Sequence, residues 1–193
     1  MPKLYLIRHA KPAASWGEDP DPGLDATGVA QADAAADSIT KRTPSIPILT
    51  SPMRRCRETS QPLEGRWSSA AALFPAVAEI PSPPLPLKER HVWLADAMAG
   101  TWQRLQQTAP PNSPDFLSWR SDMLAAVLRI PEDAVVFSHF IAINAIVAAT
   151  RGSDDVVCFR PDHASITVVD TDSGAFRIVE LGREAVTSVL TRA

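Results

Sequence analysis

The chain has 193 residues, of which 45% are hydrophobic, and this size and apolar content suit one sizeable core, so we expect a single domain over residues 1–193. Its 19 basic and 22 acidic side chains give a formal net charge of −3 at pH 7, which excludes a broad positive field for nucleic acid or for an anionic membrane. No apolar run approaches the about 20 residues of a membrane-spanning helix, and residues 1–7 are too short for a secretory signal, so we expect a soluble, cytoplasmic protein.

The first predicted element is a buried strand. Residues 4–7 form a continuous apolar run with a polar, proline-containing segment behind it, so the strand is expected to end at Arg8 and His9. The alanine-rich stretch from Thr27 to Lys41 has good helix propensity, with Asp25 or Thr27 near its start as a possible cap.

The same order of strand, loop and helix then repeats. Residues 46–49 resemble a second short strand, a turn follows at Ser51-Pro52, and residues 53–63 favour a helix up to Gln61. This alternation is typical of an α/β domain. Five prolines between positions 75 and 86 argue against a regular helix and predict an ordered surface loop, of the kind that often carries site residues.

The C-terminal half begins with a helix signal at residues 113–115. Apolar residues then recur on one helical face and are expected to belong to the core rather than to a cofactor site; they are Phe116, Trp119, Met123, Val127 and Ile130. Residues 134–137 form another apolar strand ending at Ser138 and His139, and residues 141–150 have a helical pattern. Residues 165–170 and 175–181 flank a turn-rich spacer and form a candidate hairpin.

The candidate chemistry lies at three predicted strand ends. His9 and His139 each follow a buried strand, where open α/β sheets place their ligand crevices. Arg8 adjoins His9, and the second strand is followed by Arg54, Arg55 and Arg57. Taken singly, each histidine is more simply a hydrogen-bonding residue, and the three arginines are a solvated helix face. Their joint occurrence predicts a cationic pocket for which phosphate is the natural ligand.

Such a pocket suits phosphoryl transfer. Guanidinium groups form paired, charge-assisted hydrogen bonds with phosphate oxygens and stay protonated at any working pH. A neutral imidazole can attack phosphorus in line and form a phosphohistidine, which divides one hard displacement into two easier ones. An acid is then needed to protonate the leaving oxygen.

Four blocks of the sequence resemble the histidine phosphatase superfamily, which includes cofactor-dependent phosphoglycerate mutases and many small phosphatases. The blocks are LIRHA at residues 6–10, LDATGVAQA at 24–32, SPMRRCRET at 51–59 and VFSH at 136–139. The resemblance spans most of the chain. It implies a three-layer α/β/α fold with a mostly parallel central sheet and a pocket at the carboxyl edge of that sheet.

The resemblance also implies roles for individual residues. His9 is the expected nucleophile, and Arg8, Arg55 and His139 are the expected phosphate-binding residues, with Arg55 rather than its neighbour as the matching arginine. The implied reaction is hydrolysis of a phosphomonoester, on a phosphorylated small molecule or a phosphoprotein, with no metal and no organic cofactor.

Two glutamates compete for the role of proton donor. Glu79 lies in the loop after the arginine block, where phosphatases of the family place an acidic residue, and it is the preferred candidate. Glu89 is the rival because Glu89-Arg90-His91 is similar to a mutase motif; its simpler interpretation is a surface ion pair with Arg90.

Several positions depart from the family pattern. Ala10 and Phe140 replace glycines that commonly follow the two histidines, and Phe140 would restrict the backbone if that glycine needs a positive φ. Asn144 stands where many relatives have an arginine. Pro12 and Ser15 replace the serine and asparagine with which the mutases bind phosphate, which weakens a mutase interpretation. Because of Phe140 and Asn144, a second interpretation remains: a catalytically silent module that binds a phosphorylated ligand.

Two cysteines and two tryptophans complete the expectations. Cys56 and Cys158 lack metal-ligand spacing and are expected to be buried free thiols. Trp93 and Trp102 are expected to shape the pocket entrance together with residues 81–86, although aromatic residues there equally fit core or interface packing.

Overall fold

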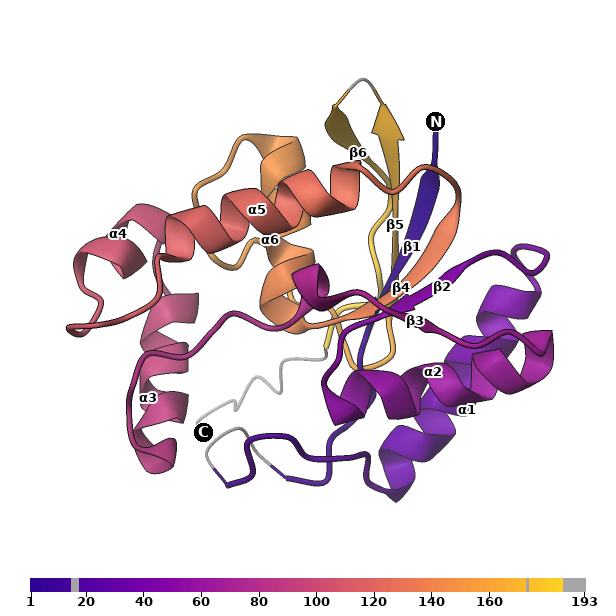
Figure 1. Ribbon diagram of the computed structural model, residues 1–193, viewed down its shortest axis with the longest axis horizontal. Helices are drawn as coiled ribbons and strands as arrows, with labels where there is room; N and C mark the ends of the chain where they lie inside the picture. Colours follow the sequence, from indigo (N-terminus) through magenta and orange to yellow (C-terminus); the bar gives the residue numbers. More distant parts are fainter. Residues whose placement is uncertain (15–17, 173, 186–193) are drawn as a thin grey trace, which may run out of the picture.

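The computed structural model describes residues 1–14, 18–172 and 174–185, and within them a mixed sheet lies between two layers of helices (Figure 1). The strand order is β3-β2-β4-β1-β5-β6. The first four strands in that order are parallel, while β5 is antiparallel to both β1 and β6. The α/β class and the mostly parallel sheet are therefore as predicted. The strands are β1 Lys3–Arg8, β2 Ile48–Thr50, β3 Ala72–Leu73, β4 Ala134–Ser138, β5 Ile166–Asp172 and β6 Ala175–Glu180.

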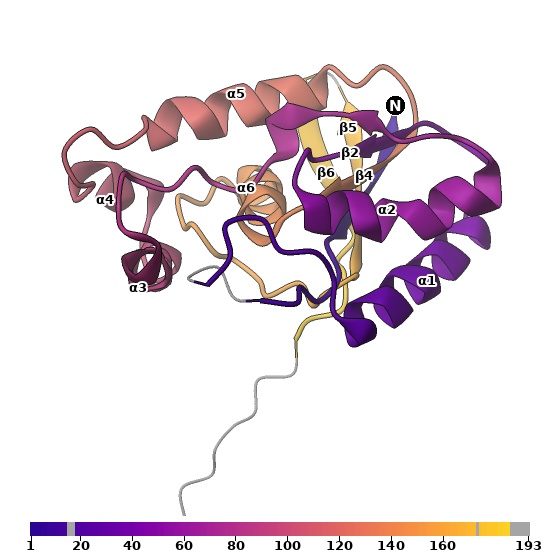
Figure 2. The same cartoon turned by 60° about the horizontal axis from the view of Figure 1, so that its bottom comes forward.

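The helices cover both faces of the sheet (Figures 1 and 2). On one face lie α1 (Ala26–Thr40) and α2 (Arg54–Trp67), and on the other lie α5 (Phe116–Leu128) and α6 (Phe140–Arg151). A 3-10 turn η1, residues Pro75–Val77, leads into a proline-rich extended segment. Two further helices, α3 (Leu87–Met98) and α4 (Trp102–Gln107), extend the second layer beyond the sheet (Figure 1).

The sequence of strand β1 is apolar without interruption because both faces of the strand are buried. Leu4 and Leu6 pack into the core under α5 and α6, whereas Tyr5 and Ile7 pack into the separate core under α1 and α2. All four are buried, so both faces of the strand require apolar side chains. In register, Arg8 pairs with Ser138 of the parallel strand β4, which places the ends of the two strands side by side.

Most predicted elements are confirmed, including the hairpin of β5 and β6 and the apolar stripe of α5. In that stripe Phe116, Met123, Val127 and Ile130 are buried in the core, and Trp119 packs against it. The proline-rich segment holds no α-helix between residues 75 and 86, also as predicted.

Four elements differ from the expectation, and one of them is helix α4, which the sequence analysis did not predict. Helix α2 continues past Pro62 to Trp67, and the guanidinium of Arg66 donates to the Pro62 carbonyl, 3.0 Å away. Strand β3 is two residues long, which is too short for any periodicity to reveal it. Helix α3 was not predicted because Ala97 is its one buried residue, so the helix lacks a clear apolar stripe.

Trp102 belongs to the core, and Trp93 packs against it. Trp102 is fully buried and stacks on Trp119, and Trp93 stacks on Phe116 with ring centroids 5.6 Å apart. The alternative of core packing is therefore the one observed for Trp102, while Trp93 is partly buried against the same core. Both cysteines are free; Cys56 is buried and Cys158 is only partly so, which corrects the expectation of two buried thiols.

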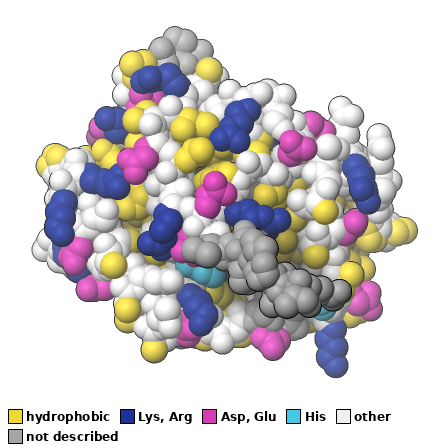
Figure 3. Space-filling view, turned by 180° about the vertical axis from the view of Figure 1, so that it is seen from behind, with side chains coloured by type: hydrophobic (Ala, Val, Ile, Leu, Met, Phe, Trp, Pro, Cys, Tyr) yellow, Lys and Arg dark blue, Asp and Glu magenta, His cyan; other side chains and the backbone are white. Residues whose placement is uncertain are grey.

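The described surface carries charges of both signs. Figure 3 shows acidic and basic side chains interspersed over one face of the molecule. Among the described residues, no helix combines the length and the apolar character that crossing a membrane requires.

Candidate active site

The two strand ends predicted to carry the chemistry meet. The backbone N–H of His9 donates to the carbonyl of Ser138, 2.9 Å away, and the ring centroids of His9 and His139 are 5.3 Å apart. The parallel pairing of β1 with β4 thus brings together two histidines that lie far apart in the sequence.

The loop after His9 is fixed to the start of α1. Asp25 caps the helix by accepting from the Gly28 N–H at 2.7 Å, and its carboxylate also pairs with Lys11 Nζ at 2.9 Å. The side-chain oxygen of Gln31 accepts from the Lys11 N–H. A Cβ on Gly28 would lie 2.1 Å from the Lys11 carbonyl oxygen, so this position requires glycine. The block at residues 24–32 therefore holds the loop that frames one side of the site.

The start of α2 supplies one buried arginine. Arg55 is 4% exposed, and its Nη2 donates to His139 Nδ1, 3.2 Å away. Its Nη1 has no hydrogen-bond partner among the described residues, and the nearest acid is Asp21 at 3.9 Å. By contrast Arg57 is exposed, and Arg54 is exposed and pairs with Glu58. Arg55 is thus the member of the arginine block that the structure brings to the two histidines.

The guanidinium of Arg8 is held from several directions. Its Nη1 donates to the Pro161 carbonyl at 2.9 Å, its Nη2 lies 3.1 Å from His163 Nε2, and the guanidinium carbon lies 5.0 Å from the ring centroid of Phe140. Burial lowers the pKa of Arg8 to about 10, which leaves the group protonated at neutral pH. Arg8 Nε has no hydrogen-bond partner among the described residues.

The imidazole of His9 has the features of a nucleophile. Its Nδ1 lies 2.9 Å from the Ala10 carbonyl oxygen, an acceptor, so Nδ1 carries the proton. Among the described residues, Nε2 makes no hydrogen bond, and its lone pair is free. Burial lowers the pKa of His9 well below 6.5, and the neighbouring His139, Arg55 and Arg8 lower it further, so the ring is neutral at neutral pH.

The imidazole of His139 is engaged on both sides. Nδ1 accepts from Arg55, so Nε2 carries the proton, and it lies 2.8 Å from Ser51 Oγ. The side chain is fully buried, and burial together with Arg55 and Arg8 lowers its pKa well below 6.5. His139 thus acts as a fixed acceptor that orients Arg55.

Of the two candidate acids, the structure brings Glu79 to the site. Its Oε1 accepts from the backbone N–H groups of Ile80 and Ile141, each at 3.1 Å, the second at the start of α6. Burial raises its pKa above 4.5, although these hydrogen bonds and the nearby arginines oppose the rise. Glu89 is exposed in the first turn of α3, and no ion pair of the described residues joins it to Arg90.

A pocket of about 190 Å³ lies beside these groups, and the fully buried His139 does not line it. The lining residues are Arg8, His9, Pro12, Ala14, Pro22, Arg55, Glu79, Leu94 and His163. Beside the charged and imidazole groups, its wall is apolar. Sequence reasoning missed His163. The topology carried a signal for it: β5 is antiparallel to β1 and begins where β1 ends, and His163 lies three residues before β5.

The geometry agrees with the comparison of sequences. A family model of the histidine phosphatase superfamily (branch 1) matches residues 4–184. The chain belongs to the histidine phosphatase superfamily. No curated protein sequence matches the chain.

Solved structures of other proteins share this fold. The alpha-ribazole phosphatase from Shigella flexneri matches with a TM-score of 0.74 and 18% identity, over 96% of this chain and 98% of that chain. A mycobacterial glucosyl-3-phosphoglycerate phosphatase matches with a TM-score of 0.73 and 21% identity, over 96% of this chain and 100% of that chain. A protein from Thermus thermophilus, TTHB049, matches with a TM-score of 0.68 and 22% identity, over 95% of this chain and 99% of that chain.

The departures from the superfamily pattern have structural explanations. Phe140 opens α6 in helical conformation, so no positive φ is needed there, and its ring supports Arg8. Asn144 is buried, and its side-chain oxygen accepts from the backbone N–H groups of Cys158 and Phe159, so it holds the chain that leads to His163. Ala10 is buried, and its N–H donates to Thr59 Oγ1. Ser15 lies outside the described residues.

Proposed function

We propose that this member of the superfamily is a phosphomonoester hydrolase that forms a phosphohistidine on His9. The observation that carries the proposal is the free Nε2 of a neutral His9 in a pocket lined by two arginines and one partly buried carboxyl group. A neutral imidazole beside fixed cations is the arrangement that attack on an anionic phosphoryl group requires.

In the first step His9 Nε2 attacks phosphorus, and the bond from phosphorus to the leaving oxygen breaks. Arg8 and Arg55 bind the equatorial oxygens with Arg8 Nε and Arg55 Nη1, two donors that have no hydrogen-bond partner among the described residues. Glu79 gives its proton to the leaving oxygen. The raised pKa of Glu79 keeps it protonated to higher pH than an ordinary glutamate.

In the second step the ionised Glu79 takes a proton from water as the water oxygen attacks the phosphohistidine. The bond between phosphorus and His9 Nε2 breaks, inorganic phosphate forms, and Glu79 is protonated again for the next cycle. His139 takes part by holding Arg55, since both of its ring nitrogens are already hydrogen-bonded. No step in this mechanism uses a metal ion or an organic cofactor.

The substrate proposed is a phosphorylated small molecule or a phosphoprotein of the cytoplasm. The pocket has room for a phosphoryl group and a small part of the leaving group, which would contact Pro22 and Leu94. Two proteins of similar structure are an alpha-ribazole phosphatase and a glucosyl-3-phosphoglycerate phosphatase. The phosphate esters in these names are the first physiological candidates to assay.

The test combines turnover with detection of the intermediate. The wild type, His9→Ala and Glu79→Ala are assayed on p-nitrophenyl phosphate with a chelator present, from acidic to neutral pH. His91→Ala is the matched control, because His91 is exposed on α3 and does not line the pocket. Chelator-resistant turnover and an acid-labile phosphoenzyme that only His9→Ala abolishes would support the proposal. Turnover by His9→Ala at the wild-type rate would overturn it.

A further inference from the structure

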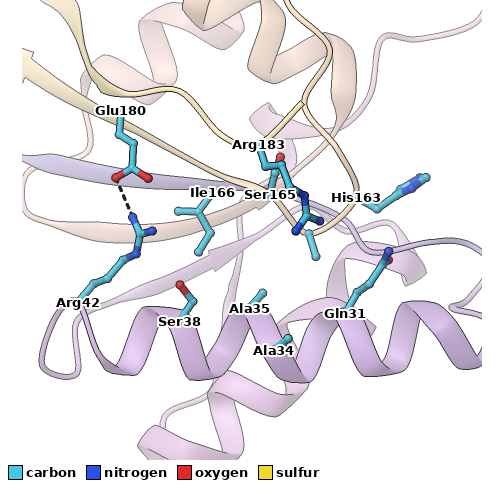
Figure 4. Close-up of a pocket in the computed structure, with 11 residues that line it drawn as sticks. Gln31, Ala34, Ala35, Ser38, Arg42, His163, Ser165, Ile166, Glu180 and Arg183 are labelled. Carbon is cyan, nitrogen blue, oxygen red and sulfur yellow. Dashed lines mark hydrogen bonds and ion pairs between the residues drawn. The ribbon is translucent and has the colours of Figure 1, made fainter. Parts of the chain in front are cut away.

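The ring of His163 faces the catalytic pocket. Its centroid lies 5.8 Å from that of His9, and its Nε2 lies 3.1 Å from Arg8 Nη2. His163 also borders a second hollow of about 320 Å³ between α1 and the hairpin of β5 and β6. In Figure 4 the ring points away from Ala35 and Ile166, which lie in the middle of that hollow. The imidazole therefore belongs to the catalytic side.

The backbone around His163 is locked to the end of β1. The N–H of Ala164 donates to the Arg8 carbonyl at 3.1 Å, and the Arg8 N–H donates to the Ser165 carbonyl at 3.2 Å. Ala164 has a φ of +54°, a conformation that non-glycine residues seldom adopt. Asp162 accepts from the His163 N–H and pairs with Arg183. The same short segment thus holds both the backbone and the side chain of Arg8.

The chemistry of the contact fixes its direction. A guanidinium has only donors, so His163 Nε2 accepts the hydrogen bond and the ring proton lies on Nδ1. Burial lowers the pKa of His163 to about 4, with Arg8 as the next cause, so the ring stays an acceptor at neutral pH. With Nη1 on Pro161 and Nη2 on His163, the guanidinium lies in one orientation, and its Nε has no hydrogen-bond partner among the described residues.

We propose that His163 is a positioning residue, which orients Arg8 toward the phosphoryl group through the hydrogen bond at its Nε2. This inference rests on the proposed function, in which Arg8 binds the phosphoryl oxygens. A positioning role differs from a role in lining the pocket, because a residue that only lines the pocket would contact the leaving group independently of Arg8.

The test compares His163→Leu with His163→Gln. Leucine cannot accept a hydrogen bond, whereas the glutamine amide oxygen can. His163→Leu is expected to lower kcat/KM and the affinity for inorganic phosphate by about 10- to 100-fold, since a charged hydrogen bond is lost, and His163→Gln is expected to restore most of both. Thermal unfolding of each variant checks that the fold is retained.

A double-mutant cycle separates positioning from a wall role. In an Arg8→Ala background His163→Leu is expected to reduce kcat/KM and phosphate affinity by less than about twofold, because the partner is already absent. The proposal is overturned if His163→Leu has equal effects in both backgrounds, or if glutamine performs no better than leucine.

A spectroscopic measurement decides the pairing even if the protein proves inactive. Imidazole ¹⁵N chemical shifts at neutral pH are expected to place the His163 proton on Nδ1 and to show a hydrogen-bonded Nε2 that changes in Arg8→Ala. A proton on Nε2 would overturn the positioning role whatever the activity. Absence of turnover in the wild type, with these shifts as expected, would instead count against the proposed function alone.

Discussion

The ends of β1 and β4 carry the same pattern, a buried strand followed by a histidine, yet the two histidines have different surroundings. After His9 the described residues up to Asp25 form neither a helix nor a strand, and His9 borders the pocket. After His139 the helix α6 begins at once, and His139 is fully buried with both ring nitrogens hydrogen-bonded. Strand position brings the two rings together, while the hydrogen-bond partners of each ring determine whether a nitrogen stays free: Ala10 binds one nitrogen of His9, whereas Arg55 and Ser51 bind both nitrogens of His139.

The largest expected effect comes from exchanging each histidine for alanine. His9→Ala should lower kcat by at least about a thousandfold, because it removes the nucleophile itself. His139→Ala should still form a phosphoenzyme on His9, but it should lose about 1–3 kcal/mol of unfolding free energy, because Arg55 and Ser51 lose a buried partner.

Rapid-quench trapping of the phosphoenzyme and thermal unfolding separate these two outcomes. A His139→Ala protein that is fully stable yet forms no phosphoenzyme would contradict the difference between the strand ends. It would give His139 a part in forming the phosphoenzyme that its buried, doubly hydrogen-bonded ring does not predict.

The next effect concerns the acid that lies between the two strand ends. Glu79 must be protonated to act as an acid, so kcat/KM should fall as the pH rises through its raised pKa. Glu79→Gln should remove this alkaline limb and lower kcat/KM by about 10² to 10⁴ for alkyl phosphates, and by less for p-nitrophenyl phosphate, whose leaving group needs little protonation. Because the pKa of His9 is low, the nucleophile stays neutral on the acidic side of the pH profile.

Profiles of kcat/KM against pH with both substrates test this expectation. Glu89→Gln is the control, since Glu89 is exposed and is not among the residues that line the pocket, and its profile should match that of the wild type. An alkaline limb that persists in Glu79→Gln and disappears in Glu89→Gln would reverse the assignment.

A smaller effect tests the packing of the segment after His9 against the start of α1. Gly28→Ala should cost about 1–3 kcal/mol of unfolding free energy, because the new methyl group meets the Lys11 carbonyl and the backbone must shift. Gly65→Ala is the matched control: a Cβ there has no neighbour within 4 Å, and it should stabilise helix α2 by about 0.5–1 kcal/mol. Denaturant unfolding measures both, and equal stability of the two variants would contradict the close approach.

The sequence predicts those contacts of the site that follow from the pairing of parallel strands, and it does not predict the others. Arg8, His9 and His139 were expected to meet because parallel strands end at one edge, and the structure brings them together. The position of Glu79 depends on the path of an irregular proline-rich segment, which no periodicity encodes. The contact of His163 with Arg8 depends on β5 lying antiparallel beside β1, a pairing that the hairpin pattern alone does not specify.

The smallest expected effect concerns the thiol that packs against the end of β4. Cys56 is fully buried, its Sγ lies 3.3 Å from His139 Nε2, and burial raises the pKa of the thiol. A thiol reagent should therefore label Cys56 only after unfolding, and Cys56→Ala should keep kcat/KM within about twofold while losing about 1 kcal/mol of stability. Mass spectrometry of the labelled native and unfolded protein checks the first expectation, and kinetics checks the second. If Cys56→Ala instead abolished the phosphoenzyme, the nucleophile would be the thiol beside β4, and the free nitrogen of His9 would need another explanation.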